Sequence, residues 1–107
     1  MPKITYNKLV RDKIPAVIES DHNTHKCHKA DQLEYKDKLT CKLQEEVREF
    51  VANPCEEEIA DILEVIDALV KYHGFDPATI ATIQKDKRSK RGGFEEGIIL
   101  EHVIIEK

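Results

Sequence analysis

The chain lacks tryptophan, and only 6% of its 107 residues are aromatic. It has no repeat, low-complexity tract or linker, and no apolar run is longer than a few residues. A transmembrane span is therefore excluded, and residues 1–13 lack the hydrophobic core of a signal peptide. We expect one compact, helix-rich domain covering residues 1–107, located in the cytoplasm.

The chain also lacks an excess of positive charge. Its formal net charge is −4, although 36% of its residues are charged. This balance gives no indication of a nucleic acid polymer or a membrane as partner. Cys27, Cys41 and Cys55 are odd in number and have no CxxC spacing, so we expect free thiols in a reducing compartment.

The hydrophobic pattern predicts two long, consecutive helices. Residues 32–52 carry apolar side chains at spacings of four and three, which indicates a helix with a buried stripe. The next helix runs from about Cys55 to Tyr72 or His73, and Gly74 ends it. The first stripe consists of Leu39, Leu43, Val47 and Phe50, and the apolar face of the second helix of Ile59, Ile62, Leu63, Ile66, Leu69 and Val70.

Weaker signals flank these helices. Asp76 and the proline after it predict the start of a further helix, and Asp12 can cap a short helix near the N-terminus. Residues 4–6 and 94–105 favour short terminal β-strands. The expected fold is therefore mostly α, with a helical bundle and short strands at the ends.

Two acidic pairs lie on the predicted long helices. Glu46 and Glu49 are three residues apart, as are Glu58 and Asp61, and residues three apart share a helix face. Two helices folded back on each other would bring the four carboxylates together. Such a cluster requires a compensating cation, and Mg²⁺ prefers oxygen ligands and often bridges to substrate phosphates.

The direction of these acids distinguishes a metal site from the alternative, a solvated acidic surface. Glu58 and Asp61 continue the stripe of Val65 and Ala68, so they point inward. Inward carboxylates are costly, which favours the metal site. Glu45 is open to two interpretations: a general base beside the metal, or a surface partner for Lys42 or Arg48.

Basic residues supply candidate phosphate ligands. Residues 85–93 read KDKRSKRGG, and their side chains could bind phosphate while the glycines let backbone amides approach an anion. The alternative is that these cations only stabilise a helix C-terminus. The candidate substrate-binding residues, including two near the N-terminus, are Lys8, Arg11, Lys87, Arg88, Arg91, Gly92 and Gly93.

Residues 19–30 show no apolar periodicity and read as a polar loop. They contain a set of potential zinc ligands, but the spacing fits no common closed zinc motif. A surface loop without metal is the competing interpretation. The residues concerned are His22, His25, Cys27 and His28.

The stretches EEVRE and EIAD resemble the EExxE…ExxD signature of the all-α nucleoside triphosphate pyrophosphohydrolases, the MazG-type superfamily. The opening YNKLVRDKIP and the closing KRGGFEEGIIL resemble a small branch described as phosphoribosyl-ATP pyrophosphohydrolase-like, or house-cleaning. The resemblance implies a helical bundle completed by a second subunit, as a homodimer or higher homo-oligomer. It also implies that Glu46, Glu49, Glu58 and Asp61 bind Mg²⁺, or Mn²⁺ in its place, with Glu45 as a further catalytic acid.

The reaction implied by this resemblance is hydrolysis between the α- and β-phosphates of a nucleotide, giving a monophosphate and pyrophosphate. Mg²⁺ would polarise the phosphate and activate water. The task that the resemblance implies is removal of non-canonical nucleotides. Histidine-pathway phosphoribosyl-ATP enzymes carry Tyr-His soon after the acidic Asp, whereas Tyr72 and His73 come much later here. Phosphoribosyl-ATP hydrolysis and a non-catalytic helical module are the alternatives.

Overall fold

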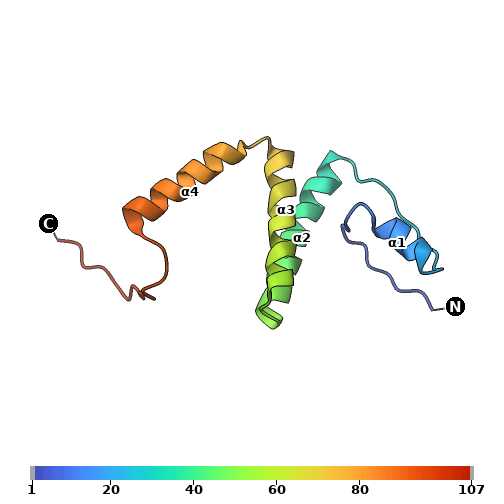
Figure 1. Ribbon diagram of the computed structural model, residues 1–107, viewed down its shortest axis with the longest axis horizontal. Coiled ribbons are helices and arrows are strands. Elements are labelled where there is room, and N and C mark those ends of the chain that lie inside the picture. Colours follow the sequence, from blue (N-terminus) through green and yellow to red (C-terminus); the bar gives the residue numbers. More distant parts are fainter. Residues whose placement is uncertain (1, 107) are drawn as a thin grey trace. The chain divides into compact units, whose positions relative to one another are not determined.

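The computed structural model describes residues 2–106, which form four helices and no strand (Figure 1). It divides into two units, the first ending at Gly74 and the second beginning at Phe75. The mostly α fold is therefore confirmed, whereas the single domain stays a prediction. No helix within these residues combines the length and hydropathy needed to cross a membrane. The helices are α1 Ile14–Ser20, α2 Gln32–Ala52 and α3 Glu56–His73 in the first unit, and α4 Pro77–Arg91 in the second.

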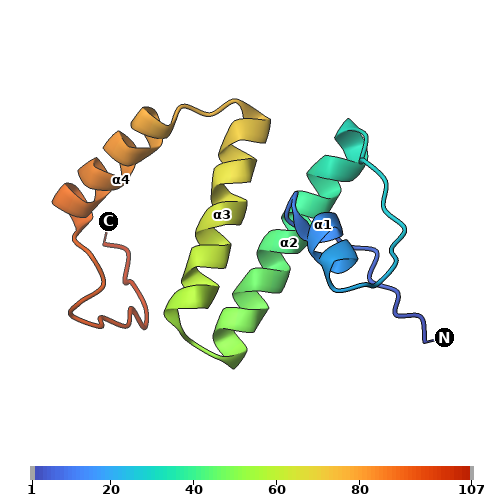
Figure 2. The ribbon, with the colours of Figure 1, turned by 45° about the vertical axis from the view of Figure 1, so that its right-hand side comes forward.

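An antiparallel pair of helices, α2 and α3, is the frame of the first unit. The two lie side by side in both ribbon views (Figures 1 and 2). Asp31 begins α2, because its side chain accepts a 2.9 Å hydrogen bond from the backbone N–H of Glu34. Gly74 ends α3 in the left-handed conformation, with φ of 70°. Both helices match the predicted ranges closely.

The core of the first unit is small. Within residues 2–106, the buried residues are Leu39 and Glu46 on α2 and Val65 on α3. Val47 was expected in the buried stripe, but it is 43% exposed. It lies one residue beyond Glu46, about 100° further around the helix, so the acid rather than the valine faces α3.

An aromatic contact joins α2 and α3 near the start of α2. The rings of Tyr35 and Tyr72 lie edge to face, with centroids 5.6 Å apart. The Tyr72 hydroxyl also donates to the carbonyl of Gln32 across 3.4 Å. These contacts hold the two helices together at the end opposite the turn that connects them, and they give Tyr72 a structural role.

The short helix α1 differs from the sequence prediction in its start. Asp12 does not cap it; Lys13 is the residue before the helix, and no side chain caps the first turn. Pro15 lies in that first turn, where its missing N–H is not needed and its fixed φ suits the helix. The proline, rather than an acidic cap, therefore marks this helix start.

The second unit consists of α4 and the segment that follows it. Asp76 caps α4 by accepting 3.1 Å hydrogen bonds from the Ala78 N–H and the Thr79 hydroxyl, as predicted. The strands expected at residues 4–6 and 94–105 are wrong, since neither range forms a strand. Strands need a hydrogen-bonded neighbour. The apolar residues of the tail are exposed instead: Phe94, Ile98, Ile99, Leu100, Val103, Ile104 and Ile105.

Candidate metal centre

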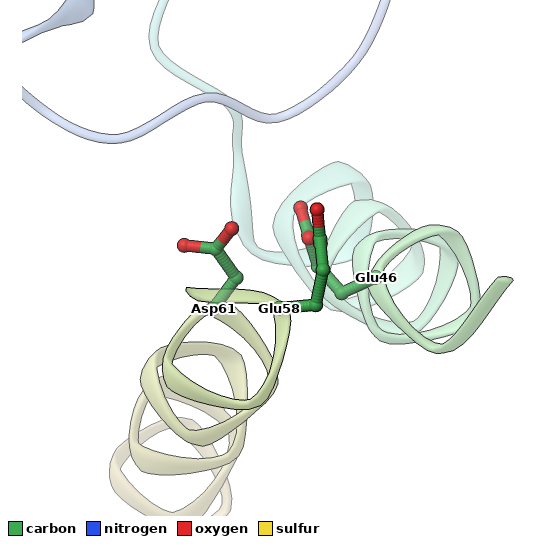
Figure 3. Close-up of side chains that lie close together, drawn as sticks. All are labelled: Glu46, Glu58 and Asp61. Atoms are coloured by element: carbon green, nitrogen blue, oxygen red, sulfur yellow. The ribbon is translucent and has the colours of Figure 1, made fainter. Parts of the chain in front are cut away.

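Three carboxylates converge where α2 faces the first turns of α3. Glu46 comes from α2, and Glu58 and Asp61 come from α3, one turn apart. One oxygen of each lies within 4.8 Å of the others. Figure 3 shows Glu46 and Glu58 pointing the same way, with Asp61 beside them. Three of the four predicted metal ligands are thus brought together, and we call Glu46, Glu58 and Asp61 the carboxylate group.

Two oxygens of the carboxylate group have no hydrogen-bond partner. They are Oε2 of Glu46 and Oε2 of Glu58, and both atoms are buried. Glu46 itself is only 5% exposed. Buried polar atoms are nearly always paired in native proteins, and an unpaired one costs about 1–3 kcal/mol. A cation bound between these oxygens would satisfy both.

The spacing of the carboxylate group suits a small divalent cation. Oxygens bound on opposite sides of Mg²⁺ lie about 4.2 Å apart, because each is about 2.1 Å from the ion. One oxygen of each carboxylate lies no more than 4.8 Å from the others, so the three oxygens surround a common point where one ion could lie. Carboxylate oxygens are also the donor type that Mg²⁺ and Mn²⁺ prefer. The residues present therefore fit the predicted ion.

Burial and a neighbouring acid change the pKa of Glu46. Burial raises the pKa of its carboxyl, and the neighbouring Glu49 raises it further, while Lys42 acts in the opposite direction. The Lys42 ammonium lies 3.2 Å from Glu46 Oε1. The overall result is a pKa of Glu46 above its ordinary value. Without a cation, the protein therefore disfavours the ionised carboxylate, which is the form that binds a metal.

Glu49 lies close to the carboxylate group without joining it. Its side chain is exposed, and no oxygen of it falls within the 4.8 Å set. Glu49 lies on α2 three residues after Glu46, and its charge raises the pKa of Glu46. Because an exposed glutamate changes rotamer freely, Glu49 is placed to become a fourth ligand only after a side-chain rotation.

A basic side chain from the N-terminal segment already contacts the carboxylate group. Arg11 Nη2 lies 2.7 Å from Asp61 Oδ1, and Arg11 Nη1 lies 3.8 Å from Glu64 Oε1. The Arg11 side chain is still 54% exposed. One predicted phosphate ligand is therefore located at the carboxylate group.

Glu45 has two cationic partners, Lys8 and Lys42, each with its Nζ 3.0 Å from a carboxylate oxygen. Burial alone would raise the pKa of Glu45, but the hydrogen bonds from Lys42 and Lys8 outweigh it and lower the pKa overall. A carboxylate with a lowered pKa is a weak proton acceptor. The geometry therefore favours the ion-pair role of Glu45 over the role of general base.

Lys42 connects Glu45 to the carboxylate group. Its ammonium lies 3.0 Å from Glu45 Oε2 and 3.2 Å from Glu46 Oε1. Burial lowers the pKa of Lys42, but the two acids more than compensate and raise it overall. Lys42 therefore stays charged beside the site. Sequence reasoning considered Lys42 only as a surface partner of Glu45.

The basic run at the end of α4 belongs to the second unit, so its part in the site stays a prediction. Within that unit, Arg88 Nη2 pairs with Glu95 Oε1 at 2.9 Å. Gly92 has φ of 83°, and its N–H donates to the Arg88 carbonyl. This N–H therefore ends the helix and is not directed at an anion. The other predicted ligands in this unit are Lys87, Arg91 and Gly93.

The loop of residues 19–30 does not assemble a metal site. His25 Nε2 lies 2.9 Å from Glu19 Oε1, and His28 Nε2 lies 2.8 Å from Glu34 Oε1. Across residues 2–106, the carboxylate group is the only cluster of three or more potential ligand residues at metal-binding distances. The zinc hypothesis for His22, His25, Cys27 and His28 thus gains no support, and Cys27, Cys41 and Cys55 are free thiols.

Sequence reasoning missed one feature of the first unit, a hollow of about 260 Å³ between the N-terminal segment and α2. Its lining includes Lys38, Lys42 and Arg48 from α2. Lys38 and Lys42 are four residues apart and share a helix face, which local spacing could have identified, whereas Arg48 lies about 120° around the helix from Lys42.

No protein-family model, curated protein or solved structure matches the chain.

Proposed function

We propose that the protein is a Mg²⁺-dependent nucleoside triphosphate pyrophosphohydrolase. It would cleave between the α- and β-phosphates and release a nucleoside monophosphate and pyrophosphate. The observation that carries this proposal is the carboxylate group, in which two buried oxygens lack a partner. Buried, unpaired carboxylate oxygens on facing helices suit a divalent cation better than they suit a stable core.

The residues of the chain have separable tasks in this proposal. Glu46, Glu58 and Asp61 would hold the ion, and Glu49 would complete the ligand set by rotating toward them. When bound, Mg²⁺ supplies charge to polarise a phosphate and activate water. Arg11, which now donates to Asp61, would turn to a phosphate oxygen.

The resemblance to the MazG-type superfamily adds support from the sequence. The EEVRE and EIAD stretches contain all four proposed ligands, and three of these lie together in space. The same resemblance favours non-canonical nucleotides as substrates, and we keep the cytoplasm as the proposed location. Tyr72 packs against Tyr35 near the start of α2, which does not favour the phosphoribosyl-ATP alternative.

We further propose that a second copy of the chain completes the bundle. Ile59, Leu63 and Ile66 form a row along α3 at helical spacing, and they are 42%, 55% and 39% exposed. Val65 is the buried residue of α3, whereas this apolar row is exposed, so α3 has a second surface suited to packing. A homodimer would cover that row.

The decisive experiment measures pyrophosphate release from a panel of canonical and modified nucleoside triphosphates, with Mg²⁺, with Mn²⁺ and with EDTA. We expect metal-dependent release that Glu58→Gln and Asp61→Asn each reduce by about a hundredfold or more. Glu57→Gln is the matched control, because Glu57 is an exposed acid next to Glu58 on α3. It should retain wild-type activity.

Two results would contradict the proposal. The first is equal turnover in Asp61→Asn and in the Glu57→Gln control. The second is a folded wild-type protein that binds Mg²⁺, as shown by calorimetry, but releases pyrophosphate from no nucleotide. That second result would favour the non-catalytic helical module, since the metal site would then serve structure or binding alone.

A further inference from the structure

The hollow between the N-terminal segment and α2 differs in charge from the rest of the chain. It has a volume of about 260 Å³. Four of its lining side chains are cationic and one, Glu45, is acidic, whereas the whole chain has a net charge of −4. The cationic residues are Lys8, Lys38, Lys42 and Arg48. Such a concentration of positive charge in a concave surface attracts an anion.

The positive charge of the hollow is only partly neutralised. Lys38 Nζ donates to the backbone carbonyl of Asn7 at 2.7 Å, a contact that leaves its charge uncompensated. Arg48 has no hydrogen bond or ion pair within residues 2–106. Lys8 and Lys42 share Glu45, which is the one acid of the lining, and Lys42 also pairs with Glu46. The hollow thus keeps cationic donors for an external ligand.

The hollow and the carboxylate group share a boundary at Lys42. This residue lines the hollow, and its Nζ lies 3.2 Å from Glu46 Oε1. A ligand with one phosphate at the carboxylate group could therefore extend directly into the hollow. Among residues 2–74, Lys42 is the one residue that forms an ion pair with both Glu45 and Glu46.

We infer that the hollow is a diphosphate subsite, which binds the two terminal phosphates of the nucleotide while the α-phosphate lies at the carboxylate group. This inference rests on the proposed function and adds the position of the leaving group. Arg48 and Lys38 would donate charge-assisted hydrogen bonds to phosphate oxygens. Lys42 would lie near the bridging oxygen that departs with the pyrophosphate.

The size of the hollow supports a diphosphate over a whole nucleotide. Pockets for drug-sized ligands have volumes of about 300–1,000 Å³, and this one falls below that range. Four cations are also more than a nucleobase needs. The nucleoside would therefore lie outside the hollow, on the other side of the carboxylate group.

Cys41 offers a direct test, because it lines the hollow and is exposed. The wild-type protein is alkylated with iodoacetamide, with and without inorganic pyrophosphate, and each cysteine is quantified by peptide mass spectrometry. Cys27 is exposed but lies outside the lining, so it is the internal reference. We expect pyrophosphate to slow alkylation of Cys41 several-fold, in EDTA as well as in Mg²⁺, and to leave Cys27 unaffected.

Variants and nucleotides sharpen the test. Arg48→Gln should weaken pyrophosphate binding about tenfold in calorimetry. Lys36→Gln, on an exposed position of α2 outside the lining, is the matched control and should bind normally. A nucleoside triphosphate should protect Cys41, and the corresponding monophosphate should not.

Three outcomes would overturn the inference: no protection of Cys41 by pyrophosphate, equal protection by the monophosphate, or equal binding by Arg48→Gln and Lys36→Gln. These outcomes differ from failure of the proposed function. Protection of Cys41 without any nucleotide hydrolysis would retain the subsite and reject the enzyme. Hydrolysis without protection would retain the enzyme and reject the subsite.

Discussion

Arg11 donates a 2.7 Å hydrogen bond from Nη2 to Oδ1 of Asp61, a residue 50 positions later in the chain. The contact joins the N-terminal segment to α3 at the carboxylate group. Because Asp61 is also a proposed metal ligand, Arg11 and a divalent cation would compete for the same carboxylate. We therefore expect Arg11 to pair with Asp61 in the absence of metal and to be released from it when metal binds.

Replacing Arg11 should separate metal binding from substrate binding. We expect Arg11→Gln to bind Mg²⁺ more tightly, by up to about tenfold, because a competing positive charge is removed. The same variant should have a higher KM for the nucleotide, since a phosphate donor is lost. Calorimetry with Mg²⁺ and steady-state kinetics test the two effects. Stability should change by less than about 1 kcal/mol, as for other exposed ion pairs.

Lys13→Gln is the control for this prediction, because Lys13 is a nearby exposed cation and is not part of the carboxylate group or its ion pairs. It should leave Mg²⁺ affinity and KM at wild-type values. Weaker Mg²⁺ binding by Arg11→Gln would contradict the competition, and would indicate that Arg11 instead supports the arrangement of the ligands.

Glu46 should make the stability of the metal-free protein depend on pH. Its pKa is raised above the ordinary value of 4.5, chiefly by burial. The folded state thus holds this proton more tightly than the unfolded state, so stability is fully present below the ordinary pKa and is lost as pH rises through the raised pKa. In EDTA, Glu46→Gln should therefore raise the melting temperature at about pH 7 and have little effect at about pH 4.

Thermal unfolding with added Mg²⁺ should reverse that ranking. The wild type should gain stability from the ion, and Glu46→Gln should gain much less. Glu57→Gln, which changes an exposed acid, should follow the wild type at both pH values and in Mg²⁺. A Glu46→Gln variant that is less stable than the wild type in EDTA at neutral pH would contradict the proposed cost of the buried carboxylate.

Leu39 should be the most sensitive apolar position of the first unit. It is 1% exposed and packs in the small core between α2 and α3. Leu39→Ala should lower the free energy of unfolding by about 2–5 kcal/mol, through lost burial and the cavity left behind. Leu33→Ala, at a 76% exposed position of α2, should change it by less than about 0.5 kcal/mol. Urea titration measures the free energy of unfolding of both variants. Similar losses of stability in the two would contradict this location of the core.

The apolar row of α3 should control association. Leu63 is 55% exposed at the middle of the row, and a charge placed there would be buried without a partner in a dimer. We expect the wild type to sediment as a dimer and Leu63→Glu as a monomer, with the dissociation constant raised about a hundredfold or more. Lys71→Glu, an exposed change on the same helix, should remain dimeric. A monomeric wild type would contradict the proposed assembly.

The sequence by itself determined the two long helices and the candidates for the metal site. Helix α2 begins and ends where periodicity predicted, and Gly74 ends α3, because these features depend on neighbours within one or two turns. The same local geometry selected Glu46, Glu58 and Asp61, since spacing along a helix decides which residues share a face. Information of this kind is present in any short window of the chain.

Only the tertiary structure decided what each of these residues contacts. It left Glu49 outside the carboxylate group, paired Glu45 with Lys8, and brought Arg11 to Asp61. It also gave no strand to the β-prone residues 94–105, because strands form only with a partner elsewhere in the chain or in another chain. Contacts between distant residues depend on how helices pack, and packing is a property of the whole fold rather than of local spacing.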